Sequence, residues 1–362
     1  MNLEAICEKI RNGMRISPGE GLRLLREAGL LDLAEVANEA RFRHNPGERV
    51  TFVADTNPNY TNVCENDCSF CAFYRHKGEK GAYTAGVDEM IRNFRAAADS
   101  GATTVLLQGG VNPALAFDYF LEMVKRTIAE VPGVHPHFYS APEIMGMSRA
   151  SDLTVPIVLK KLWDAGLRTL PGGGAEILSD RVKKKISPRK GTSADWLYVI
   201  REAHRIGYKS TATMMYGHLE SDEDILFHLE SIRHLQDEYR GFTAFVPWSF
   251  KPDNTPLGKI ITQRATPTRY LQIIALARIY LDNFPHIQAS WFSEGKKIGQ
   301  IALHFGADDF GGTLLEENVH AAANFFNSAS TEECIKLIHG GGFDAAERNT
   351  FYEIKEIFAL GK

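Results

Sequence analysis

Three cysteines in one short segment are the residues whose types and spacing most directly suggest chemistry. Cys64, Cys68 and Cys71 lie in the segment TNVCENDCSFCAFYR, whereas the whole chain has only five cysteines. On a compact loop, three thiolates at C-x3-C-x2-C spacing can point at one centre. They could hold a zinc ion, for which His76 is a conceivable fourth ligand. They could equally hold a [4Fe–4S] cluster, in which one iron would have no protein ligand and would stay open.

The composition indicates a globular protein of a reducing compartment. The chain has 362 residues, a formal net charge of -4 and 44% hydrophobic residues. This charge argues against a general nucleic-acid binder, and no apolar run is long enough to span a membrane. The first residues read as an amphipathic helix and not as a signal peptide. We therefore expect a cytoplasmic protein without nucleic-acid or membrane partners, in which clustered cysteines are more often metal ligands than disulfides.

Short apolar runs alternate with amphipathic helical segments from about residue 50 onward. Eight such runs are strand-like: RVTFVADTN, TTVLLQGG, HPHFYSAPEI, LRTLPGGG, YKSTATMMYG, GFTAFVPWSF, HIQASWF and ADDFGG. Alternation of this kind predicts parallel strands joined by right-handed crossovers, and eight units predict an α/β fold of the (β/α)8 TIM-barrel type. We expect residues 1–46 to form a helical N-terminal extension with two helices. Residues 47–362 should form the barrel with C-terminal helices.

The barrel prediction places the unusual motifs of the chain on one face. The active sites of such barrels lie at the C-terminal ends of the strands. The cysteine segment follows the first expected strand, QGG the second, SAPE the third and PGGGAE the fourth. YGH, PWSF, SW and DDFGG follow the remaining four strands. The motifs should therefore surround a single site.

The cysteine motif, with Phe70 directly before its last cysteine, resembles the signature of the radical S-adenosylmethionine (SAM) superfamily. The resemblance implies a [4Fe–4S] cluster on the three cysteines, with the amine and carboxylate of SAM on the open iron. It also implies that an electron, from an unidentified donor, cleaves SAM to give a 5′-deoxyadenosyl radical. The superfamily uses a full or partial (β/α)8 barrel, which agrees with the fold expected from the strand pattern.

The same resemblance assigns residues to SAM. The QGG turn occupies the place of the superfamily's Gly-Gly-Glu motif, whose backbone carbonyls receive the methionine ammonium. No acid follows the glycines in this chain. The alternative is that QGG is only a tight turn at the end of a strand. The carboxylate in PGGGAE would accept bonds from ribose hydroxyls, or could cap the next helix. One cation of the run RVKKKISPRK would pair with the SAM carboxylate, while most of the run would be a solvated helix face. The expected SAM-binding residues are Phe70, Gln108, Gly109, Gly110, Ser140, Glu176 and Arg181.

Longer blocks resemble the futalosine-pathway radical enzymes of menaquinone synthesis, and relatives in deazaflavin synthesis share some of them. These blocks are LPGGGAEILSDRVKKKISP, TATMMYGHLES, LQDEYRGFTAFVPWSFKPDNTPLG, NFPHIQASW and FGADDFGGTLLEEN. CAFYRHKGEKGAYT and QGGVNP are most similar to the family of cyclic dehypoxanthine futalosine synthases, with the aminofutalosine synthase family as the alternative. A zinc-stabilised binding protein on a barrel scaffold is the alternative from a different class.

The cyclase resemblance implies an intramolecular C–C bond formation on dehypoxanthine futalosine. The adenosyl radical would take hydrogen from ribose C4′, the C4′ radical would add to the benzoate ring, and a proton and an electron would then leave. Such a site needs donors for the benzoate and a base for the ring proton. Three of the candidates also have a structural interpretation. His218 could be a buried structural histidine, Trp248 could belong to the core, and Asn283 could simply end a helix. The candidates are Tyr74, His218, Trp248, Asn283, Gln288, Ser290 and Asp308.

Overall fold

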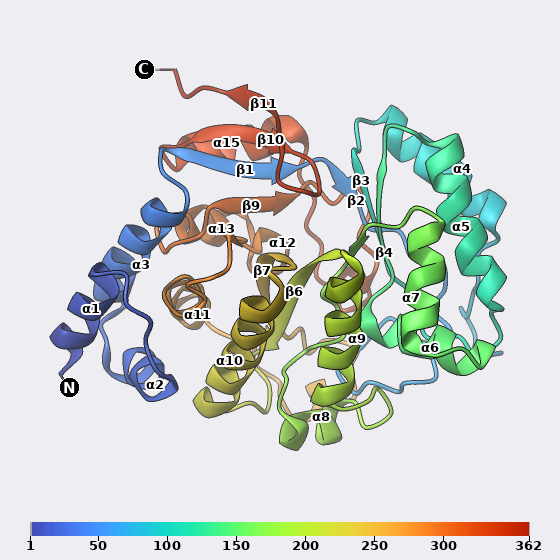
Figure 1. Cartoon of the computed structure of the whole chain (residues 1–362), viewed down its shortest axis with the longest axis horizontal. Helices are drawn as coiled ribbons and strands as arrows, with labels where there is room; N and C mark the ends of the chain where they lie inside the picture. The colour runs from blue at the N-terminus through green and yellow to red at the C-terminus, as the bar shows by residue number, and fades with distance from the viewer. Residues whose placement is uncertain (1, 362) are drawn as a thin grey trace.

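Three helices precede the first strand in the computed structural model, which describes residues 2–361 (Figure 1), whereas two were expected. They are α1 (Leu3–Arg11), α2 (Pro18–Glu27) and α3 (Leu30–His44). The second begins with a capping box, in which the backbone N–H of Ser17 donates to Glu20 and that of Glu20 donates to the Ser17 hydroxyl. These helices pack on the outer helices α10 (Asp222–Tyr239) and α11 (Pro267–Tyr280).

Parallel strands in chain order form the centre of the molecule. They are β1 (Arg49–Val53) with its continuation β2 (Asp55–Thr56), β3 (Thr104–Leu107), β4 (His135–Phe138), β5 (Thr169–Leu170), β6 (Lys209–Tyr216), β7 (Phe242–Ser249), β8 (His286–Ile287) and β9 (Asp309–Gly312). A bridge between Gln288 and Asp309 connects β8 to β9, which pairs with β1. The curved parallel sheet confirms the predicted fold class.

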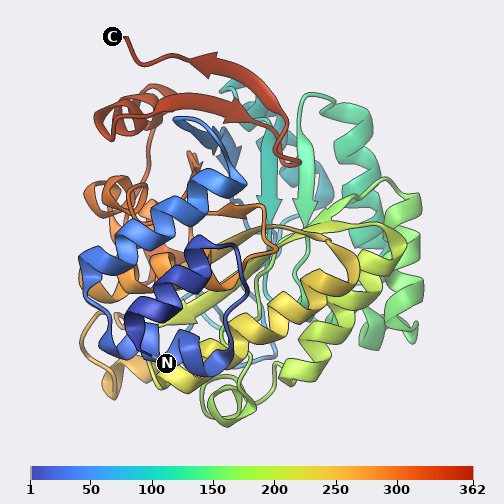
Figure 2. The same cartoon turned by 60° about the vertical axis from the view of Figure 1, so that its left-hand side comes forward.

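Helices cover the outside of the strands (Figures 1 and 2), and α11 among them is itself buried beneath α2 and α3. They are α4 (Val87–Asp99), α5 (Phe117–Glu130), α6 (Ala141–Ser151), α7 (Val155–Asp164), α8 (Asp180–Ile186), α9 (Ser193–Ile206), α10, α11, α12 (Trp291–Glu294) and α13 (Lys296–Ala302). Between residues 2 and 361, no helix is both long and apolar enough to cross a membrane.

Helix α6 begins directly after β4. The run HPHFYSAPEI was read as strand-like with SAPE following the strand, and in the structure β4 ends at Phe138 and the helix begins at Ala141. The cause is a capping box, because Glu143 accepts hydrogen bonds from both the backbone N–H and the hydroxyl of Ser140. Pro142 fits the first turn of a helix, where no backbone donor is needed.

The chain continues past the barrel with α14 (Val319–Ala322), α15 (Thr331–Gly340), β10 (Asp344–Arg348) and β11 (Ile354–Phe358). The expectation of C-terminal helices alone omitted these two strands. Strand β10 runs parallel to β1 and pairs with it, and β11 is antiparallel to β10 (Figure 2). The segment that follows β10 enters the barrel interior, where the hydroxyls of Thr350 and Thr104 lie 2.8 Å apart.

Candidate active site

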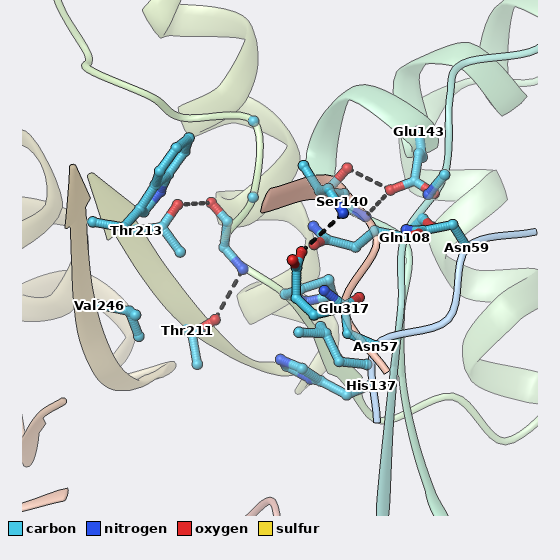
Figure 3. A pocket seen from close by; sticks show the side chains of 18 of the residues that line it. Asn57, Asn59, Gln108, His137, Ser140, Glu143, Thr211, Thr213, Val246 and Glu317 are labelled. Carbon is cyan, nitrogen blue, oxygen red and sulfur yellow. Dashed lines mark hydrogen bonds between the residues drawn. The ribbon is translucent and has the colours of Figure 1, made fainter. Parts of the chain in front are cut away.

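One cavity of about 340 Å³ lies inside the barrel and joins the cysteine segment to the inner face of the strands. This size is typical of small-molecule sites. Its wall includes side chains from successive strands, among them His137 on β4 and Thr211 on β6 (Figure 3). The predicted site residues that line it are Cys64, Cys68, Phe70, Cys71, Tyr74, Gln108, Gly109, Gly110, Ser140, Glu176, Trp248 and Gln288.

The three cysteines line the cavity on the irregular segment between β2 and α4. The Sγ atom of Cys64 accepts a hydrogen bond from the backbone N–H of Val111 at 3.3 Å. Burial raises the pKa of the Cys68 thiol to about 12. A thiol in such surroundings becomes a thiolate only when a cationic centre is bound to it. The segment therefore suits metal ligation better than it suits a freely reactive thiolate.

His76 does not line the cavity that the three cysteines share. His76, the conceivable fourth zinc ligand, is half exposed and lies 3.3 Å from Asp67. A [4Fe–4S] cluster binds each cysteine at a separate iron, so its thiols need not converge as the ligands of one ion must.

The QGG turn packs directly against the cysteine segment. A Cβ atom added to Gly110 would lie 2.2 Å from the carbonyl oxygen of Val63 and 3.0 Å from the Cβ of Cys64. The backbone N–H of Gly110 also donates to Thr61 at 2.9 Å. Only glycine allows this approach, because any side chain would displace the segment that carries the first cysteine. The motif is thus more than a tight turn at a strand end.

Glu143 provides a carboxylate beside this turn, although no acid follows the glycines in sequence. One of its oxygens accepts from the Tyr60 hydroxyl at 2.7 Å and from the N–H of Gly109 at 3.0 Å. The other accepts from the backbone and the hydroxyl of Ser140. Burial raises the pKa of Glu143, and these hydrogen bonds oppose that shift. Sequence reasoning missed this residue, whose only signal was the Ser140–Glu143 capping spacing.

Glu176 and Lys190 form a buried ion pair at the cavity wall, with Lys190 Nζ 2.6 Å from Glu176 Oε1. Among residues 2–361, the buried Oε2 of Glu176 has no hydrogen-bond partner, so it is free to accept one from a ligand. Glu176 adopts a positive φ of 44°, which is strained for a residue other than glycine. Burial alone would lower the pKa of Lys190, but Glu176 and the cysteine thiols raise it above its usual range.

Lys190 corrects the expected role of Arg181. Both belong to the run RVKKKISPRK, but α8 ends at Ile186 and the following loop returns Lys190 to the cavity. Its Nζ lies 5.3 Å from the centre of the Phe70 ring, beside the cysteines. Arg181 is half exposed, lies outside the cavity and pairs with Asp224. Lys190 is thus the cation of this run that could face the carboxylate of SAM.

Two predicted residues follow the expected strands but turn away from the cavity. The ring of His218 is buried, with Nε2 3.0 Å from the carbonyl oxygen of Met215 and Nδ1 3.3 Å from Glu220. Ser290 is also buried, and its backbone N–H donates to the Tyr270 hydroxyl. The structure therefore corrects the substrate or base role expected for either residue and gives both a local packing role.

Two other predicted residues precede their strands and so lie at the opposite end of the barrel. Asn283, before β8, donates to the carbonyl oxygen of Arg233 at 2.8 Å. Asp308, before β9, pairs with Arg278 and lies 2.6 Å from Nδ1 of His286. Because catalytic groups of barrels lie after the strands, this placement corrects both expectations.

Two threonines of β6 fix the glycine-rich loop after β5. The Thr211 hydroxyl accepts from the N–H of Gly172 at 2.9 Å, and the Thr213 hydroxyl donates to its carbonyl oxygen at 2.8 Å (Figure 3). A Cβ atom on Gly172 would lie 2.5 Å from the backbone of Thr211. Trp248 lies on the neighbouring strand, with its ring centre 5.6 Å from that of His320. The cavity thus combines fixed polar groups with aromatic surface.

Together these features are those of an enzyme site at the C-terminal end of a parallel barrel, with clustered thiols suited to a metal centre. The model of the radical SAM superfamily matches residues 58–232, and that of the CofH/MqnC C-terminal region matches residues 239–360. The chain belongs to the radical SAM superfamily, whose members use a [4Fe–4S] cluster and SAM. The clustered thiols, the glycine turn against them and the unpartnered carboxylate oxygen of Glu176 fit these cofactors.

Curated relatives match nearly the whole chain. The cyclic dehypoxanthine futalosine synthase of Halalkalibacterium halodurans is 36% identical over 358 residues, which are 99% of this chain and 96% of the relative. The 5-amino-6-(D-ribitylamino)uracil–L-tyrosine 4-hydroxyphenyl transferase of Methanoculleus marisnigri is 42% identical and covers 97% of each. The aminodeoxyfutalosine synthase of Thermus thermophilus is 38% identical, covering 96% of this chain and 94% of the relative.

Solved structures show the same fold at low sequence identity. The [FeFe]-hydrogenase maturase HydG has a TM-score of 0.75 at 18% identity, covering 95% of this chain and 75% of the maturase. Methylornithine synthase PylB has a TM-score of 0.74 at 18% identity, covering 93% of this chain and 96% of the synthase. These similarities support the fold of the chain. They do not identify its substrate.

Proposed function

We propose that this enzyme converts dehypoxanthine futalosine to cyclic dehypoxanthine futalosine in menaquinone synthesis. The observation that carries the proposal is the single cavity that joins the cysteines and Glu176 to the inner face of the strands. In such a cavity SAM and a substrate would lie side by side. The similarity to cyclic dehypoxanthine futalosine synthases over nearly the entire chain supports this substrate.

The chain's own groups would hold SAM against the cysteine segment. The cluster, when bound, supplies the electron that cleaves SAM to give the 5′-deoxyadenosyl radical. Lys190 would pair with the methionine carboxylate, and backbone carbonyls of the QGG turn would accept from the methionine ammonium. The free oxygen of Glu176 would accept from a ribose hydroxyl. Glu143 would position the turn through Gly109 without contacting SAM.

The interior of the cavity would hold the substrate. Hydrogen abstraction from ribose C4′ requires that this hydrogen lie close to the adenosyl carbon, and the rigid barrel wall would fix that distance. Trp248 would pack on an aromatic ring of the substrate. Exclusion of water would protect the radical until the C–C bond to the benzoate ring has formed.

A second candidate function follows from a specific finding. The 42% identity to the tyrosine 4-hydroxyphenyl transferase of Methanoculleus marisnigri exceeds the 36% and 38% identities to the two cyclases. On that reading, the same site would act on L-tyrosine and 5-amino-6-(D-ribitylamino)uracil. Aminodeoxyfutalosine synthesis is the remaining alternative, by the similarity to the Thermus thermophilus enzyme.

Anaerobic assays of the reconstituted enzyme with SAM and a chemical reductant distinguish these functions. The proposal expects dehypoxanthine futalosine to give cyclised product together with 5′-deoxyadenosine, both identified by mass spectrometry. L-Tyrosine with the ribityl uracil should give no coupled product. Formation of that coupled product, or of aminodeoxyfutalosine, without cyclisation of dehypoxanthine futalosine would refute the proposal.

A further inference from the structure

Asp55 is a cavity carboxylate that the SAM-binding groups leave unused. It lies on β2, only 7% exposed, in the cavity wall. Its Oδ1 accepts a hydrogen bond from the backbone N–H of Leu314 at 2.9 Å. Within residues 2–361, no other residue donates a hydrogen bond to its Oδ2. One oxygen therefore fixes the side chain, while the other can accept a proton from a molecule in the cavity.

Burial keeps Asp55 basic for a carboxylate. It raises the pKa of Asp55 to about 6, against the hydrogen bond from Leu314, which lowers it. The charged group facing it from β10 is Arg348, whose Nη2 and Nε bind both oxygens of Asp309 on β9, at 3.0 and 2.5 Å. Asp309, which raises the pKa of Asp55, and Cys334 on α15 also lie within electrostatic reach. Arg348 lowers this pKa, but it pairs directly with Asp309 and not with Asp55.

The other acids of the cavity have other roles. Glu143 accepts hydrogen bonds at both oxygens, and Glu176 pairs with Lys190 through Oε1 and is assigned to a ribose hydroxyl of SAM through Oε2. The oxygens of Glu317 accept from the backbone N–H groups of residues 319 and 320. Burial lowers the pKa of His137 to about 3, so this imidazole is a weak base. Asp55 is thus the cavity acid with both a free oxygen and useful basicity.

We propose that Asp55 is the catalytic base that accepts the proton lost when the substrate ring regains aromaticity. The inference rests on the proposed cyclase function. After the C4′ radical has bonded to a ring carbon, the C–H bond at that carbon breaks. Its proton moves to Oδ2 of Asp55, and the remaining electron passes to a one-electron acceptor of the iron–sulfur class. The ring closes its aromatic system, and Asp55 is left neutral.

The Asp55→Asn variant tests this role because its amide oxygen can still accept from Leu314. Wild type and variant are compared anaerobically with dehypoxanthine futalosine deuterated at ribose C4′. We expect equal iron content and deuterated 5′-deoxyadenosine from both, while cyclised product per deoxyadenosine falls about 100-fold in the variant. Product formation by wild type should rise with pH through about 6, and that rise should vanish in the variant.

Two controls separate a base from a structural group. Asp55→Glu keeps a carboxylate and should restore part of the cyclisation, and the exposed Glu316→Gln should behave as wild type. Loss of deoxyadenosine and product together in Asp55→Asn, without rescue by Asp55→Glu, would show a structural role and overturn the inference. An unchanged product ratio and pH profile would overturn it as well. Wild type that makes no cyclised product would overturn the cyclase proposal first and this inference with it.

Discussion

Replacement of Gly110 by alanine should damage the cluster site more than its single added methyl group suggests. The new Cβ would lie 2.2 Å from the carbonyl oxygen of Val63 and 2.7 Å from its carbonyl carbon, whereas ordinary contact begins near 3.4 Å. The neighbouring atoms are backbone, so no side-chain rotation can relieve the overlap. The segment carrying Cys64 must therefore move by about 1 Å, and functional sites tolerate about 0.5 Å.

The size of the effect follows from the cost of overpacking, which is about 1–3 kcal/mol for one added carbon in a tight site. If this cost falls on SAM binding, the Kd for SAM should rise between about 5-fold and 160-fold. The iron content after reconstitution should also fall, because the first cysteine no longer lies where the cluster requires it. Both effects arise from displacement, since alanine removes no hydrogen-bonding group.

The assay is anaerobic reconstitution followed by iron and sulfide analysis and equilibrium SAM binding. Gly133→Ala is the matched control, because its Cβ would have no atom within 4 Å and its φ is ordinary. The control should keep the iron content and SAM affinity of wild type. A Gly110→Ala protein with wild-type iron content and SAM Kd would refute the close packing of the turn against the cysteine segment.

Three further predictions concern single side chains. Cys68→Ala should lose the iron–sulfur absorbance and the bound iron, while Cys334→Ala, outside the cavity, should keep both. Lys190→Gln should weaken SAM binding at least about tenfold in calorimetry by removing the buried cation, whereas the exposed Lys184→Gln should bind normally. The pKa of Asp55 is about 6 in the folded protein, above its usual 3.8, so wild type should lose stability as pH rises from about 4 through 6. Relative to wild type, Asp55→Asn should therefore gain up to about 3 kcal/mol of unfolding free energy as the pH rises over that range. Denaturant unfolding of both proteins at several pH values measures this difference. A difference in unfolding free energy that stays constant with pH would contradict the prediction.

Local patterns predicted the architecture because they report directly on local structure. The alternation of β-branched runs with amphipathic helices predicted the barrel strands, and the cysteine spacing predicted the ligand set. The pairing of β10 with β1 depends on contacts between residues almost 300 positions apart, for instance Arg49 with Asp344. No local signal in the sequence encodes such a contact, so the two C-terminal strands were missed.

The same reasoning explains the site residues that were misplaced. Asn283 precedes the expected strand HIQASWF, so the strand pattern itself already placed it at the end of the barrel opposite the site. The sequence could not distinguish Lys190 from the other cations of the run RVKKKISPRK. Its position in the cavity depends on the path of the loop after α8, which composition does not predict. Asp55 was read as the polar end of a strand, since its burial depends on β9 and β10. Tertiary structure decides which polar side chains at strand ends face the interior.

The pairing of β10 with β1 also has a consequence for how the enzyme reaches its active form during synthesis. The first strand of the barrel pairs with β9 and β10, which are synthesised more than 250 residues after it. Such a high contact order slows folding and leaves the edges of β1 unpaired until both strands have been made. The cysteine segment directly follows this strand, so its thiols remain on an incomplete scaffold until then. A finished cluster site therefore requires that β9 and β10 have been translated and have paired with β1.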